Sequence, residues 1–128
     1  MLVAAAVLAA LAALLHVFIW WLESFAWTGR ARAVFDTSRE EAEATRELAF
    51  NQGYYNLFLA LITITGVIAL ALDHRTVGVA LIAAGTLSMV GAAVVLVAGS
   101  GARAGAALRQ GLLPALAVTC LLIVGLGS

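Results

Sequence analysis

The chain has 128 residues, of which 64% are hydrophobic and 11% are charged, and its formal net charge is zero. A soluble domain is typically about 45–50% apolar and about 25% charged, so this composition excludes an ordinary soluble globule and predicts a protein embedded in a lipid bilayer. The balanced charge gives no reason to expect a nucleic-acid partner.

Four apolar segments are long enough to cross a bilayer, and we expect spans at about 2–22, 50–72, 76–98 and 106–127. A spanning helix needs roughly 20 predominantly apolar residues. The first apolar run is too long for a signal peptide and no basic residue precedes it, so we expect a permanent helix. The predicted fold class is therefore all-α, a polytopic four-helix transmembrane bundle forming a single domain over residues 1–128.

The loop at 23–49 is predicted to be partly helical. Thr37-x-x-Glu40 and Ser38-x-x-Glu41 both fit the capping box that starts a helix. We expect this helix to begin near Arg39 and to run straight into the second span.

Arginines are distributed unequally between the two ends of such a bundle. The loops 23–49 and 99–109 share one end and hold six of the seven arginines, whereas the other end holds only Arg75. Positively charged loops stay in the cytoplasm. We therefore predict that both loops are cytoplasmic and both termini outside, in a bacterial inner (plasma) membrane.

The third and fourth spans carry features that bear on helix packing. Gly78, Gly85, Ala92 and Gly99 recur every seven residues, which places small residues along one stripe. Such a stripe lets helices approach closely, either within the bundle or in a homo-oligomer. Pro114 should kink the fourth helix and free a carbonyl near Gln110.

Polar residues converge on the half of the bundle next to the long loop. In the first span, His16 and Glu23 are seven residues apart and share a helix face with Trp20 and Trp27. The second span begins with four more polar or aromatic candidates, and the fourth begins with another; these are Asn51, Gln52, Tyr55, Asn56 and Gln110. The opposite half offers only threonines and serines, which can hydrogen-bond to carbonyls of their own helix. Ionisable groups inside a membrane are costly and mark functional sites by default.

Each group also has a purely structural interpretation. Glu23 can sit at the headgroups, paired with Arg109 or Arg30, and His16 can hydrogen-bond to a neighbouring helix. The amide side chains can cap or cross-link helices, and the aromatic residues can anchor the protein at the interface.

The pattern resembles a known family. His16 and Glu23, then Trp27, then Asn-Gln-Gly-x-Tyr-Asn at 51–56 and Gln-Gly-x-x-Pro-Ala at 110–115, are similar to a bacterial and fungal family of small integral membrane proteins. That family is catalogued as a domain of unknown function, number thirteen-oh-four. The resemblance implies a four-helix membrane architecture and no activity, so no functional residue is carried over from it.

Three functions are compatible with these residues. The first is binding of, or catalysis on, a lipophilic small molecule, with His16 and Glu23 transferring protons and the aromatic and amide residues lining the pocket. The first alternative is a structural partner subunit whose polar groups hold helices together, and the second is a small oligomeric proton, ion or solute transporter. Two ligands two turns apart do not chelate one metal ion, so we expect no metal and no other cofactor.

Overall fold

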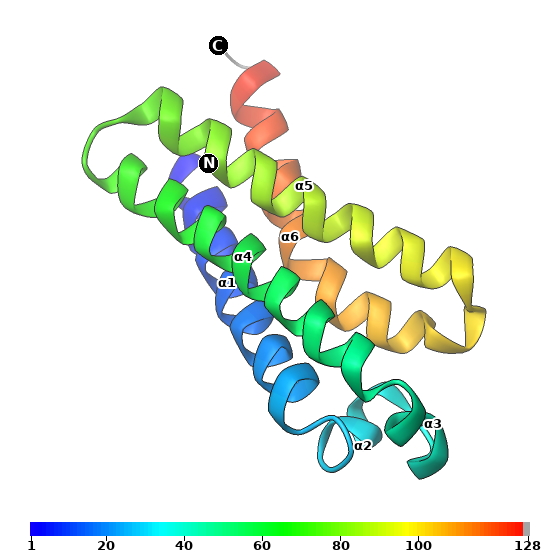
Figure 1. Ribbon diagram of the computed structural model, residues 1–128. Helices are drawn as coiled ribbons and strands as arrows, with labels where there is room; N and C mark the ends of the chain where they lie inside the picture. The colour runs from blue at the N-terminus through cyan, green and yellow to red at the C-terminus, as the bar shows by residue number, and fades with distance from the viewer. Residues whose placement is uncertain (127–128) are drawn as a thin grey trace.

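The computed structural model describes residues 1–126, and they form four long helices and three short ones (Figure 1). The long helices are α1 (Leu2–Phe25), α4 (Arg46–Ala71), α5 (Arg75–Gly99) and α6 (Ala104–Leu126). The short ones are α2 (Ala31–Phe35), α3 (Arg39–Ala44) and the 3₁₀ turn η1 (Gly101–Arg103). Four helices are long and apolar enough to cross a membrane, which indicates a multi-pass membrane protein.

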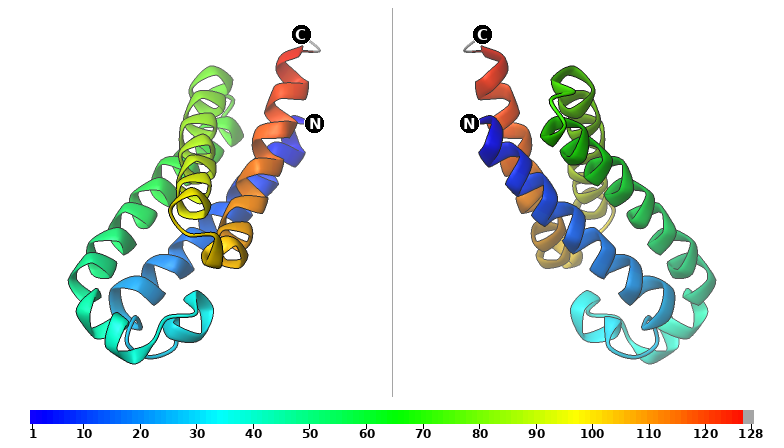
Figure 2. Two further views of the ribbon diagram at one scale, coloured as in Figure 1. Left: turned by 90° about the vertical axis from the view of Figure 1, so that its right-hand side faces the viewer. Right: turned by 90° about the vertical axis from the view of Figure 1, so that its left-hand side faces the viewer.

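The long helices form an antiparallel bundle in which α1 packs against α4 and α6, and α5 packs against α4 and α6. The N-terminus, the α4–α5 turn and the last turn of α6 lie at one end of the bundle, and α2 and α3 lie at the other (Figures 1 and 2). The predicted all-α four-helix fold is confirmed. The predicted end of the fourth span at residue 127 lies outside the described residues.

A tight turn joins α4 to α5 at the end opposite the long loop. Asp73 adopts a left-handed conformation (φ 63°), which aspartate tolerates better than most residues. The His74 backbone N–H donates to the Ala69 carbonyl at 2.9 Å, so the end of α4 is capped by the turn itself. The two helices therefore leave this turn side by side.

Glycines allow the backbones of α4 and α5 to approach closely near that turn. A Cβ atom on Gly66 would lie 2.7 Å from the Ile82 nitrogen, and one on Gly78 would lie 2.7 Å from the Leu70 nitrogen. Further along α5, a Cβ on Gly85 would collide with the Thr63 hydroxyl of α4. Backbones this close require residues without side chains.

The close contact between α4 and α5 does not continue toward the other end of α5. A Cβ on Gly99, on the same stripe as Gly78 and Gly85, would meet nothing within 4 Å. Figure 1 shows α4 and α5 diverging from the turn toward the end that carries α2 and α3. The predicted small-residue stripe thus packs inside the bundle at Gly78 and Gly85, whereas Ala92 and Gly99 are exposed. A homo-oligomer through the stripe stays a prediction.

A second close contact joins α4 to α1. Gly53 lies so near α1 that a Cβ there would be 3.0 Å from the Trp20 carbonyl oxygen and would collide with the Ser24 hydroxyl. The Ser24 hydroxyl also donates to the Phe50 carbonyl at 3.2 Å. This contact fixes the loop-side halves of α1 and α4 against each other.

The long loop between α1 and α4 is partly helical, as predicted. The Ser38 hydroxyl accepts from the Glu41 N–H at 3.1 Å, so Ser38 is the N-cap of α3 and makes one of the two hydrogen bonds of the second expected capping box. The expectation of one continuous helix into α4 is wrong, because Thr45 (φ −106°, ψ 8°) separates α3 from α4. The Thr45 hydroxyl accepts from the Trp27 indole N–H at 3.1 Å. The loop therefore folds back onto the end of α1.

Candidate functional site

A cavity of about 320 Å³ lies at the loop-side end of the bundle. All four long helices, the long loop and η1 contribute to its lining. Six of the residues predicted from the sequence lie around it: Glu23, Trp27, Gln52, Tyr55, Asn56 and Gln110. Positions far apart in sequence thus meet at one site, as the convergence of polar residues predicts.

A hydrogen-bonded pair of side chains joins α1 and α4 at this cavity. The Asn56 Nδ2 group donates to Oε2 of Glu23 at 2.7 Å. The same Nδ2 group lies 3.3 Å from the Gln52 carbonyl oxygen, to which it also donates. A backbone carbonyl only accepts, so these two contacts fix the orientation of the amide, and within residues 1–126 Oδ1 of Asn56 is left as a free acceptor.

Aliphatic side chains form another part of the cavity lining. Leu59 of α4 and Ala92, Val95 and Leu96 of α5 line the cavity. The Val95 side chain is 70% exposed, because α5 has separated from α4 at this level. The cavity lining is therefore amphipathic, with both polar and aliphatic groups.

Two arginines connect η1 and α6 to the long loop near the cavity. Arg103 of η1 forms an ion pair with Glu41 of α3 at 2.9 Å, with both side chains nearly half exposed. The Arg109 guanidinium donates to the Val34 carbonyl of α2 at 3.1 Å. Within residues 1–126, Glu23 forms an ion pair with neither Arg109 nor Arg30, in contrast to the structural interpretation drawn from the sequence.

Three predicted site residues do not line this cavity. His16 is 1% exposed, and its Nδ1 atom lies 2.9 Å from the Ala12 carbonyl of its own helix. Asn51 is exposed on the outside of α4. Trp20 packs edge-on against Tyr54, and within residues 1–126 its buried Nε1 has no hydrogen-bond partner. The structure thus separates His16 from the cavity that Glu23 lines.

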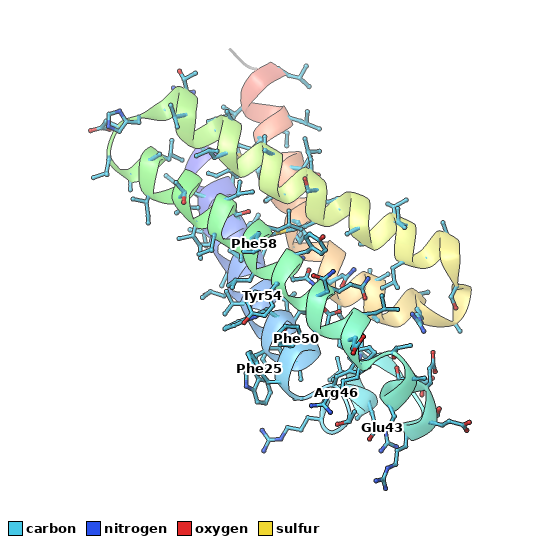
Figure 3. All side chains as sticks on the ribbon, in the orientation of Figure 1. Phe25, Glu43, Arg46, Phe50, Tyr54 and Phe58 are labelled. Atoms are coloured by element: carbon cyan, nitrogen blue, oxygen red, sulfur yellow. The ribbon has the colours of Figure 1, made fainter. Side chains whose placement is uncertain are left out.

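Trp20 belongs instead to an aromatic cluster between α1 and α4. Phe50, Tyr54 and Phe58 follow one another at four-residue intervals along α4, and Phe25 lies beside them (Figure 3). The ring centroids of Phe50 and Tyr54 are 5.1 Å apart, and those of Phe25 and Phe50 are 6.2 Å apart. Exposed aromatic residues near a helix end are typical of membrane-interface anchors.

Hydroxyl groups in the other half of the bundle behave as predicted. Five of them donate to the carbonyl four residues earlier in their own helix, and these are Thr63, Thr65, Thr86, Ser88 and Thr119. Their hydrogen bonds need no partner from another helix. The interhelical polar contacts described above all lie in the loop-side half.

Sequence reasoning missed several lining residues. Phe35 and Thr37 reach the cavity from the long loop, and Arg103 reaches it from η1. The aliphatic wall was also missed, because an apolar residue in an apolar helix carries no signal of its own. Arg103 is the exception, since it is one of two arginines at the start of the fourth span and could have been considered.

The fold and the cavity define a small multi-pass four-helix membrane protein with a polar, loop-side site. A family model described as "Protein of unknown function (DUF1304)" matches residues 10–122, from within α1 to within α6. The chain belongs to this family, as the resemblance of its motifs implies. Searches of curated proteins and of solved structures find no match.

Proposed function

We propose that the protein binds a lipophilic small molecule in the loop-side cavity. The observation that carries this proposal is the Glu23–Asn56 pair, which lies in a cavity with an aliphatic wall. Ligand sites are typically lined mostly by apolar groups with a few polar groups that orient the ligand. A carboxyl group within a membrane helix is costly, and binding a ligand offers a reason for keeping it.

The arginines support an orientation for this site. Six of the seven lie in or beside the loops at the cavity end of the bundle, and Arg75 lies at the other end. The proposed cavity accordingly lies in the cytoplasmic half of a bacterial plasma membrane. If the protein also transforms its ligand, Glu23 is the general acid or base, because His16 does not line the cavity.

The proposal is tested by mass spectrometry of molecules that copurify with the protein. Wild type is compared with Glu23→Gln and with Glu47→Gln, whose exposed carboxylate on α4 lies outside the cavity. We expect a defined lipophilic molecule in wild type and Glu47→Gln that is lost in Glu23→Gln. The same bulk phospholipids in all three samples would contradict the proposal.

A structural role for the polar residues is the second candidate, and two contacts favour it. The Asn56–Glu23 and Ser24–Phe50 hydrogen bonds both join α1 to α4. Interhelical hydrogen bonds of this kind contribute about 0.6 kcal/mol on average in membrane proteins. In that case Glu23→Gln lowers the stability of the bundle and leaves the copurifying molecules unchanged.

A further inference from the structure

We infer that the ligand of this cavity is a single-chain amphiphile whose headgroup donates hydrogen bonds, and whose apolar chain leaves the cavity between α4 and α5. This inference rests on the proposed function and adds the chemical class and the orientation of the ligand.

The first argument concerns the hydrogen-bonding groups that remain free. Asn56 uses its Nδ2 group for Glu23 Oε2 and the Gln52 carbonyl. Its Oδ1 atom and the Glu23 Oε1 atom are left as acceptors, since the bond from Asn56 is the only one that Glu23 makes within the described residues. These acceptors favour a headgroup that donates, and the side-chain amides of Gln52 and Gln110, which also line the cavity, can donate to the same headgroup or accept from it.

The second argument concerns charge. Glu23 and Arg103 are the two ionisable side chains with a formal charge that line the cavity. Arg103 is already paired with Glu41, and within residues 1–126 no arginine or histidine forms an ion pair with Glu23. A carboxylate on the ligand would therefore meet another acid beside it, and Arg103 could neutralise it only by leaving Glu41, which is unfavourable. An alcohol or an amine on the ligand is not subject to this repulsion from Glu23.

The third argument concerns the opening of the cavity. Its most exposed lining residues include Tyr55 on α4, 60% exposed, and Val95 on α5, 70% exposed, so the mouth lies between these helices. Glu23 reaches the cavity from α1, on the opposite side. The glycine contacts are consistent with this opening, because α4 and α5 touch at Gly66 and Gly78, whereas a Cβ on Gly99, on the same stripe of α5, would meet nothing within 4 Å.

The position of this mouth along α5 indicates which part of the bilayer lies outside it. At a rise of about 1.5 Å per residue, Val95 is roughly 6 Å and Ala92 roughly 10 Å along α5 from its end at Gly99. Both positions belong to an apolar spanning helix, so the mouth faces the acyl chains of one leaflet. A volume of about 320 Å³ is near the lower end of the usual range for ligand pockets, roughly 300–1,000 Å³. The cavity holds a headgroup and the start of a chain, and the rest of the chain lies in the lipid.

The headgroup is tested by titrating delipidated protein in detergent with four probes of equal chain length. The probes are a long-chain primary alcohol, the corresponding amine, the carboxylate and the methyl ether, and bound probe is counted by native mass spectrometry. We expect the alcohol and the amine to bind about three- to tenfold more tightly than the carboxylate and the ether, because a hydrogen bond contributes about 0.5–1.5 kcal/mol. Glu23→Gln should reduce this preference, and Glu47→Gln should keep it.

The route of the chain is tested with a bulky residue at the mouth. Ala92→Phe should lower binding of the alcohol at least about tenfold, whereas Val94→Phe, at a 62% exposed position outside this cavity, should leave it unchanged. Circular dichroism checks that both variants are folded, and if Ala92→Phe is not, Ala92→Leu replaces it. Equal binding of the alcohol by the two variants overturns the inferred route of the chain between α4 and α5.

The outcomes separate the two proposals. Carboxylate binding as tight as alcohol binding overturns the headgroup inference, while a copurifying molecule lost in Glu23→Gln still supports the proposed function. Binding of none of the probes, together with copurification of bulk lipid only, overturns both.

Discussion

The close contact between α4 and α5 makes a quantitative prediction about Gly66. Replacing Gly66 with alanine places a Cβ atom 2.7 Å from the Ile82 nitrogen and 3.0 Å from the Gly78 carbonyl oxygen, where backbone atoms cannot give way as a flexible side chain does. The two helices must move apart, and overpacking of this kind costs about 1–3 kcal/mol. Alanine also favours the helix over glycine by about 0.5–1 kcal/mol, which offsets part of this cost.

Gly91→Ala is the matched control, because its Cβ atom would meet nothing within 4 Å. It gains the same helix propensity without the collision, so the difference between the two variants isolates the collision. We expect Gly66→Ala to be less stable than Gly91→Ala by about 1–3 kcal/mol in the free energy of unfolding. The assay is reversible unfolding in mixed detergent micelles, followed by circular dichroism. Equal stability of the two variants would refute the close α4–α5 packing.

Three further predictions concern polar contacts. A double-mutant cycle with Glu23→Ala and Asn56→Ala, followed by the same unfolding assay, should give a coupling energy of about 0.6–1.7 kcal/mol, and a coupling near zero would contradict their hydrogen bond. Breaking the exposed Arg103–Glu41 ion pair with Arg103→Gln should change the unfolding free energy by less than about 1 kcal/mol; a larger loss would mean that this pair anchors the loop. Ser38→Ala removes the cap of α3 and should speed amide hydrogen exchange in α3 but not in α4, whereas unchanged exchange in α3 would argue against the cap.

Much of the fold can be predicted from features that are visible in the sequence. Long apolar segments predict the helices, and the short turn at Asp73 predicts that α4 and α5 are antiparallel neighbours. The break at Thr45 does not follow, because helix propensity alone favours continuing from α3 into α4. Its hydroxyl accepts from Trp27, a tertiary contact that a local pattern does not contain.

The candidate site was predictable only where its residues are conspicuous. Glu23 and Asn56 stand out because carboxyl and amide groups are rare in spanning helices, and their partnership follows from two segments that enter the same half of the bundle. His16 is equally conspicuous, but its ring nitrogen lies against the Ala12 carbonyl of its own helix, away from the cavity. Sharing a helix face with Glu23 does not determine which neighbour each side chain meets.

The cavity itself depends on a divergence of helices that the sequence does not encode locally. The small-residue stripe indicates close packing along all of α5, yet the contact ends beyond Gly85. Where α5 leaves α4, residues such as Val95 become cavity wall without any change in their chemistry. Only the three-dimensional arrangement distinguishes these aliphatic residues from the others that face lipid.

Photo-crosslinking in the native membrane tests the central claim most directly. A photoreactive amino acid replaces Leu96, which lines the cavity, or Val94, which lies on the same helix outside it. The proposed binding function predicts that position 96 captures a defined lipophilic molecule which position 94 does not, and that Glu23→Gln abolishes this adduct. The same mixture of phospholipid adducts at both positions, unchanged by Glu23→Gln, would contradict a ligand-binding cavity.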